Sequence, residues 1–136
     1  MAQNAKEFRY AIGLDRAGRL TAEGASPLEL AAAWTPEHLV LAGLVRCTLQ
    51  SLRFHADREG LDFLARAGAA GTVTKRPEDG RYAFVEIDVE LDLELEPPPG
   101  PDELRALLDK AERDCFVGAS LQPSLRYRWR VNGSEV

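Results

Sequence analysis

Apolar and acidic side chains alternate without interruption between residues 85 and 96. One set is Val85, Ile87, Val89, Leu91, Leu93 and Leu95, and the other is Glu86, Asp88, Glu90, Asp92, Glu94 and Glu96. A period of two predicts a β-strand with one buried and one solvated face. The turn signal "PEDG" precedes it, so residues 70–95 are expected to form a hairpin.

Carboxylates along one strand face raise the question of a metal site. Calcium sites take their ligands from a tightly curved loop, so an extended strand favours a solvated acidic face with cations beside it, and no metal is expected. The last apolar alternation supplies the cations, because Leu125, Tyr127, Trp129 and Val131 alternate with Arg126, Arg128 and Arg130. We expect these arginines to lie near the acidic strand.

Two other segments complete the strands and the first helix. Phe8, Tyr10, Ile12 and Leu14 alternate ahead of the turn "DRAGR" and a return strand "LTAEG", which predicts an N-terminal hairpin. A long helix is expected from Pro36 to near Gly60, with Thr35 as its N-cap. It is apolar nearly all round from residue 39 to residue 49, which indicates burial, within the chain or between two chains.

A second helix follows the linker "PPPG". Leu104, Leu107, Leu108, Ala111 and Cys115 recur at helical spacing, so Cys115 is expected to continue the buried face to the end of this helix. The predicted order is strand, strand, helix, strands, helix, strand. This order indicates an α+β fold with antiparallel sheets rather than a parallel α/β sheet.

Length and charge limit the classes of protein. A chain of 136 residues is expected to form one domain spanning residues 1–136. Its net charge of −5 argues against nucleic acid as a partner. The N-terminus resembles no signal peptide, and the apolar run 39–49 is too short to cross a bilayer, so a cytoplasmic protein without a membrane partner is expected.

The chain has two cysteines, Cys47 and Cys115, 68 positions apart. Their number and spacing fit neither a zinc site nor a local CxxC motif, and no cofactor is expected. Buried fillers or a transient redox pair remain the alternatives for a reduced compartment. Cys47 follows Glu37 by ten residues on the predicted helix, so the two side chains differ by roughly 80° in direction and can border one pocket.

The order of these motifs resembles the OsmC/Ohr family, the osmotically inducible protein C and organic hydroperoxide resistance proteins. "TPEHLVLAGLVRC" is similar to the family's helix with Pro-Glu and a cysteine ten residues beyond that glutamate. "AERDCFVGASL" is similar to the element with the second cysteine, and "FVEIDVELDL" lies between them as in that family.

The resemblance implies a fold and an activity. Members are intertwined homodimers of α+β fold with a long buried central helix, and they reduce hydroperoxides through a cysteine pair that a dithiol, such as a dihydrolipoyl group, recycles. Cys47 would then be the peroxidatic thiol and Cys115 the resolving thiol. Glu37 would orient an arginine beside the thiolate, which the turn "DRAGR" assigns to Arg16, with Arg19 as the competitor.

Three positions depart from the family's pattern. Arg46 replaces a small residue before the first cysteine, and Phe116 and Gly118 replace a proline and a serine-like residue after the second. They favour a divergent member and leave an alternative open, a dimeric binding or regulatory protein of the same fold with weak or lost peroxidase activity. A purely structural pair of thiols would instead place Cys47 and Cys115 far apart.

Overall fold

The computed structural model describes residues 5–136, which divide into two compact units, one up to Thr35 and one spanning Pro36–Val136. The first unit contains an antiparallel hairpin of β1 (Ile12–Leu14) and β2 (Leu20–Ala22). Asp15 closes the turn, because its carboxylate accepts hydrogen bonds from the backbone N–H groups of Ala17 and Arg19. The predicted N-terminal hairpin is confirmed, with shorter strands than the alternation suggested.

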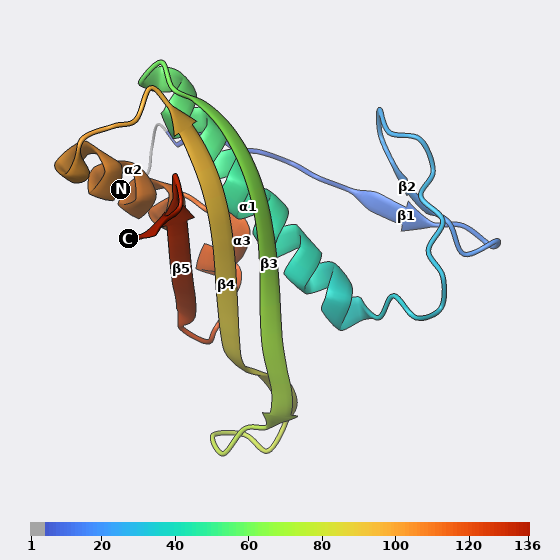
Figure 1. The fold of residues 1–136 in the computed structure, drawn as a ribbon. Coiled ribbons are helices and arrows are strands. Elements are labelled where there is room, and N and C mark those ends of the chain that lie inside the picture. Colours follow the sequence, from blue (N-terminus) through green and yellow to red (C-terminus); the bar gives the residue numbers. More distant parts are fainter. Residues whose placement is uncertain (1–4) are drawn as a thin grey trace. The chain divides into compact units, whose positions relative to one another are not determined.

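The second unit is built on a four-stranded sheet in the order β3-β4-β5-β6 (Figure 1). Its strands are β3 (Asp62–Lys75), β4 (Tyr82–Glu96), β5 (Leu125–Val131) and β6 (Ser134–Glu135). β3 and β4 form the predicted hairpin, and β5 lies beside β4. That pairing is parallel, because the helical connection carries the chain back to the end at which β4 began, so the expected antiparallel sheet is in fact mixed.

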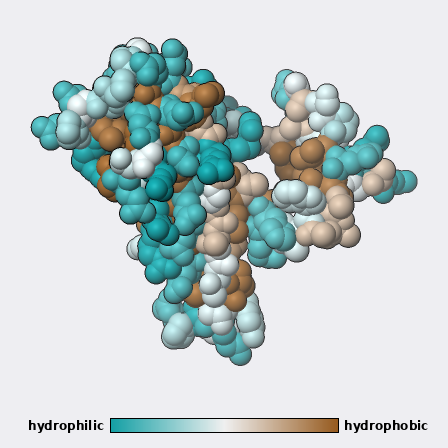
Figure 2. All heavy atoms as spheres, in the orientation of Figure 1, coloured by the Kyte–Doolittle hydropathy of each residue, from teal (hydrophilic) through white to brown (hydrophobic). Residues whose placement is uncertain are grey.

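The two faces of β4 have the predicted characters. Ile87, Val89, Leu91, Leu93 and Leu95 are buried, whereas the acidic side chains point to the other face, which Figure 2 shows as hydrophilic over β4 and β5. The expected arginine neighbours are also found. Arg126 binds Asp88 through both carboxylate oxygens at 2.6 and 2.9 Å, and Arg128 binds Glu90 at 3.0 Å.

The long helix α1 (Pro36–Arg58) packs against the second helix and β3. Its end is closed by Gly60, whose φ of 70° suits glycine. The N–H of Gly60 bonds to the carbonyl of Asp57 and that of Leu61 to Ala56, the two bonds of a Schellman motif. Leu44, Leu52 and Ala56 of α1 are fully buried, while Leu39 and Val40 near its start remain partly exposed.

The second helix, α2 (Pro101–Arg113), is shorter than the sequence indicated, and a further helix, α3 (Phe116–Ser120), follows it. Leu107, Leu108 and Ala111 bury the predicted face of α2. Cys115 does not lie at the end of α2, as expected, but is the N-cap of α3. The prediction was wrong for a physical reason, because the chain turns at Asp114 and ends α2 there. Cys115 is nevertheless buried, although it lies outside α2.

Candidate functional site

The two cysteines lie together although 68 residues separate them. Cys47 is in the middle of α1, and Cys115 is between α2 and α3. Both are free thiols, and the Cys47 thiol is close enough to act on Cys115 as a hydrogen-bond partner and as a second charge. The arrangement therefore excludes the alternative of two structural thiols placed far apart.

The first turn of α3 contacts both sulfurs. The backbone N–H of Val117 donates to Cys47 Sγ at 3.5 Å, and the next N–H, that of Gly118, donates to Cys115 Sγ at 3.3 Å. Backbone N–H groups are hydrogen-bond donors that favour a sulfur in its ionised form. A single turn of backbone thus holds both sulfurs in place and can stabilise negative charge on either.

The two thiols differ in exposure. Cys47 is half-buried, whereas Cys115 has no exposed surface. Burial raises the pKa of the Cys115 thiol and Cys47 raises it further, while a hydrogen bond with Thr48 and one from the Gly118 N–H oppose the rise. Cys47 therefore has surface that a solute can reach in this chain, whereas Cys115 has none.

Two hydroxyl groups border the thiols that the sequence analysis did not single out. Thr48 Oγ1 lies 3.5 Å from Cys115 Sγ and donates to the Leu44 carbonyl at 2.9 Å. Tyr127 lies on the inner face of β5, and its buried hydroxyl has no hydrogen bond of normal geometry within residues 5–136. The sequence held a signal for Tyr127, because it is a polar side chain among the apolar positions of its strand.

Gly118 lies where these groups meet. A Cβ on Gly118 would lie 3.2 Å from the Tyr127 hydroxyl, 3.4 Å from Cys115 Sγ and 3.0 Å from a methyl group of Leu125. The Leu125 methyl group and the Tyr127 hydroxyl would have to shift by a few tenths of an ångström to admit that atom. Glycine at this position therefore lets α3 pack closely against β5 and Cys115.

The candidate arginines belong to the N-terminal unit, where their local surroundings differ. Arg19 donates from Nε to Asp15 Oδ2 at 2.8 Å, so its guanidinium is held by the turn itself. Within residues 5–136, no acidic side chain forms an ion pair with Arg16. Of the two turn arginines, Arg16 is thus the one without an acidic partner among the described residues.

Glu37 and Arg46 also take defined positions on α1. Glu37 is exposed in the first turn of the helix, and ten residues of helix place it about 15 Å along the axis from Cys47. At that separation the Glu37 carboxylate does not contact the Cys47 sulfur. Arg46 is exposed to solvent, and the polar contacts of the two sulfurs within residues 36–136 come from Thr48, Val117 and Gly118 rather than from a guanidinium.

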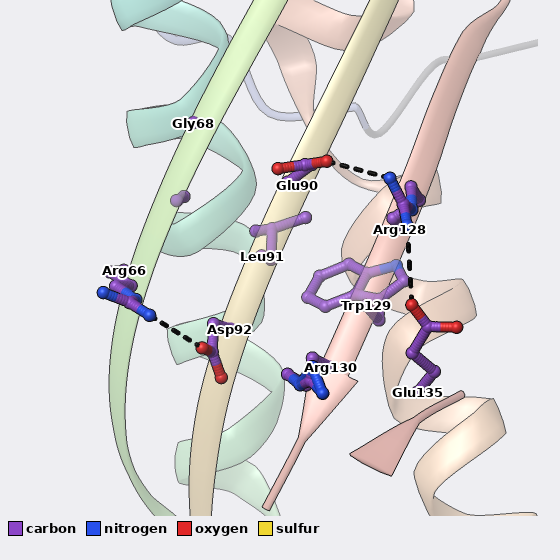
Figure 3. Close-up of a pocket in the computed structure, with 10 residues that line it drawn as sticks. Arg66, Gly68, Glu90, Leu91, Asp92, Arg128, Trp129, Arg130 and Glu135 are labelled. Atoms are coloured by element: carbon purple, nitrogen blue, oxygen red, sulfur yellow. Dashed lines mark hydrogen bonds and ion pairs between the residues drawn. The ribbon is translucent and has the colours of Figure 1, made fainter. Parts of the chain in front are cut away.

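A separate hollow of about 350 Å³ lies on the charged face of the sheet (Figure 3). Ion pairs span it, from Arg66 to Asp92 at 3.4 Å and from Arg128 to both Glu90 and Glu135. Carboxylates neutralise these cations in a solvated setting, which describes a self-paired surface rather than a reaction site. In the described part of the chain, no three His, Cys, Asp or Glu side chains gather in a way that could hold a metal ion.

Across residues 5–136, no helix combines the length and the apolar character needed to span a bilayer.

Comparison with known proteins identifies the family. The family model described as OsmC-like protein matches residues 21–130. A search of curated proteins gave no match. Among solved structures, an OsmC-like protein from Mycoplasma pneumoniae has 16% sequence identity and a TM-score of 0.67, with 93% of this chain and 97% of that chain covered.

Two further structures extend the comparison. An OsmC-like protein of unknown function from Vibrio cholerae has 13% identity and a TM-score of 0.71, covering 92% of this chain and 99% of its own. The organic hydroperoxide resistance protein of Bacillus subtilis has 18% identity and a TM-score of 0.55, covering 91% and 96%. At these identities the structures show the shared fold, and the family model, which spans most of the chain, shows the membership. The mixed α+β chain, with two cysteines brought together by α1 and α3, belongs to the OsmC-like family.

Proposed function

We propose that this protein is a thiol-dependent peroxidase that reduces organic hydroperoxides in defence against oxidative stress. The meeting of Cys47 and Cys115 is the observation that carries the proposal, because a two-cysteine peroxidase needs two thiols that can join after one is oxidised. Some structural neighbours are themselves named organic hydroperoxide resistance proteins, which agrees with this class of substrate.

The first step takes place at Cys47. Its thiolate attacks the distal oxygen of the hydroperoxide, the O–O bond breaks, and the alcohol leaves after it gains a proton, so that Cys47 becomes a sulfenic acid. The half-buried position of Cys47 and the Val117 N–H beside its sulfur support this role. Arg16 would stabilise the charge and position the peroxide, and Glu37 would orient Arg16, with Arg19 remaining the competitor.

The second step takes place at Cys115. Its sulfur attacks the sulfenic sulfur of Cys47, a disulfide forms, and the hydroxyl group leaves as water. An external dithiol, of dihydrolipoyl type, would then reduce the disulfide by thiol–disulfide exchange. The complete burial of Cys115 supports this assignment, because a sheltered thiol reacts with its neighbour rather than with solutes.

The proposed working form is a cytoplasmic homodimer, each chain acting as one domain over residues 1–136. The partial exposure of Leu39 and Val40 at the start of α1 supports association, because a helix that is apolar on all sides buries those side chains best against a second chain.

The test is hydroperoxide consumption with a dithiol reductant. We expect turnover with cumene hydroperoxide by the unaltered protein, a loss of at least 100-fold in Cys47→Ser, and a single turnover without recycling in Cys115→Ser. Thr72→Ser, on the exposed part of β3, is a matched control that should leave turnover unchanged. Unaltered turnover in Cys47→Ser would refute the proposal.

A second candidate is a dimeric binding or regulatory protein that retains the fold. The exposed Phe116 next to Cys115, and sulfur contacts that within residues 36–136 include no guanidinium, favour this alternative. It predicts that a stoichiometric hydroperoxide leaves both thiols reduced. An alkylation count of the free thiols after such treatment separates the two functions.

A further inference from the structure

Cys115 raises a problem for the proposed reaction. A buried thiol holds its proton, yet the sulfur must be ionised to attack the sulfenic acid on Cys47. Something near Cys115 must therefore stabilise the ionised sulfur when the reaction begins. Within residues 36–136, the polar groups that contact Cys115 Sγ include the Gly118 N–H, Thr48 Oγ1 and the Cys47 thiol.

The hydrogen bonds of Thr48 fix the direction of its contact with the thiol. Thr48 has one hydroxyl hydrogen, and that hydrogen is given to the Leu44 carbonyl at 2.9 Å. The contact of 3.5 Å between Thr48 Oγ1 and Cys115 Sγ is therefore made by the thiol hydrogen. In the reduced protein, Cys115 donates and Thr48 accepts.

Tyr127 supplies a donor that this arrangement leaves unused. Its buried hydroxyl has no hydrogen-bond partner of normal geometry within the described chain, which costs free energy in a folded protein. Burial raises the pKa of Tyr127 to about 12, so the hydroxyl keeps its hydrogen at neutral pH, and the Thr48 hydroxyl is close enough to oppose that rise. The hydroxyl and Cys115 Sγ both lie beside Gly118.

We propose that Tyr127 and Thr48 form a hydroxyl relay that stabilises Cys115 in its ionised form. As the Cys115 thiol loses its proton, the Thr48 hydrogen turns from the Leu44 carbonyl to the sulfur, and the Tyr127 hydroxyl donates to the Thr48 oxygen. Tyr127 is thus a positioning residue that acts through Thr48. The Tyr127 hydroxyl, which donates to no acceptor with normal geometry among the described residues of the reduced protein, then donates to Thr48 when Cys115 is ionised.

The relay rests on the proposed peroxidase for its reaction step, which balances as follows. The S–S bond forms between Cys115 and Cys47, the S–O bond of the sulfenic acid breaks, and the departing hydroxyl combines with the proton lost by Cys115 to give water. The Cys115 sulfur is oxidised and the Cys47 sulfur is reduced. Tyr127 and Thr48 gain and lose no atom overall.

The decisive measurement does not require peroxidase activity. In a Cys47→Ser background, where Cys115 is the one remaining thiol, its pKa is measured from thiolate ultraviolet absorbance against pH. Adding Tyr127→Phe removes one oxygen atom and should raise that pKa by about one unit, the size expected for the loss of a hydrogen bond that supports a charged group. Thr48→Val should raise it at least as much.

Controls guard against a purely structural explanation. Tyr82→Phe alters an exposed tyrosine on β4 and should leave the pKa of Cys115 unchanged. Melting temperatures show whether each variant is folded, and Thr48→Val provides the second test if Tyr127→Phe is unstable. An unchanged Cys115 pKa in a folded Tyr127→Phe or Thr48→Val variant overturns the relay.

A kinetic arm connects the relay to the reaction. After one equivalent of hydroperoxide, disulfide closure in Tyr127→Phe should be about tenfold slower at fixed pH, because the ionised fraction of Cys115 is about tenfold smaller. Equal closure rates would overturn the kinetic role. If the unaltered protein forms neither sulfenic acid nor disulfide, the proposed function fails, and the pKa measurement still decides whether Tyr127 and Thr48 act on Cys115.

Discussion

Polar side chains find their partners in different ways on the two sides of the four-stranded sheet. On the outer face, the carboxylates of β4 lie in register with the arginines of β5, so that Asp88 faces Arg126 and Glu90 faces Arg128. On the inner side, apolar side chains exclude water, and the two thiols lie among them next to the hydroxyls of Thr48 and Tyr127.

This difference indicates where chemistry can occur. A charge that is solvated and already paired gains little from a ligand, whereas a buried hydroxyl or thiol without full hydrogen bonding is poised to respond when its neighbour changes charge. The acidic face of β4 attracts attention in the sequence, but the candidate reactive groups lie on the other side of the sheet.

The inner face should be the sensitive one. Leu93 is fully buried on β4, so Leu93→Ala should lower the free energy of unfolding by about 2–5 kcal/mol through lost burial and the cavity it leaves. Glu94→Ala, the next residue but on the outer face, is the matched control and should change stability by about 0.5 kcal/mol or less. Urea unfolding of both variants measures the difference, and similar losses would contradict the contrast.

Asp114 lies at the end of α2, next to Cys115. Arg113 first, and His55 second, lower the pKa of Asp114 from 3.8 to about 2, and His55 Nε2 lies 2.7 Å from its carboxylate. A lowered pKa stabilises the fold above pH about 4, and that contribution is lost as the pH falls toward 2.

Asp114→Asn should therefore destabilise the protein at neutral pH by about 1 kcal/mol, a modest figure because Asp114 is partly exposed and solvent screens the charges. The difference from the unaltered protein should shrink as the pH falls from about 4 to about 2. Asp109→Asn, on the exposed side of α2, is the control. A difference that is constant with pH would show that the ionised carboxylate is not the cause.

The ion pairs between β4 and β5 on the outer face should contribute least to stability. Arg126→Gln removes both hydrogen bonds to Asp88, yet the pair is exposed and water screens its charges, so the loss of stability should be the smallest of the three. The loss should be smaller still in molar salt, which screens exposed charges. Urea unfolding at low and high ionic strength measures it. A large loss that does not depend on salt would mean that the outer face supports the fold as much as the inner one.

The sequence predicted the features that depend on local pattern. The period-two alternation of β4 and β5 fixed their inner and outer faces, and Pro36 and Gly60 located both ends of α1. It failed where the chain changes direction. Cys115 keeps the helical spacing of α2 but lies in a turn, and the parallel pairing of β4 with β5 depends on a connection whose path no local pattern specifies.

The candidate site was predicted in the same uneven way. The meeting of Cys47 and Cys115 was anticipated from motifs, but Thr48 and Tyr127 were missed because a hydroxyl shows its importance through its missing hydrogen bonds. Missing hydrogen bonds can be recognised only when the neighbours of a group in three dimensions are known. In the sequence, Thr48 directly follows Cys47 and cannot be told apart from an ordinary residue of the helix.

The most direct test of the account is whether one peroxide molecule joins the two sulfurs. The reduced protein is treated with one equivalent of an organic hydroperoxide, then digested without reduction and analysed by mass spectrometry. The account predicts a loss of about two mass units per chain and a peptide pair linked through Cys47 and Cys115. Unlinked peptides carrying two reduced thiols, with the hydroperoxide unconsumed, would contradict it.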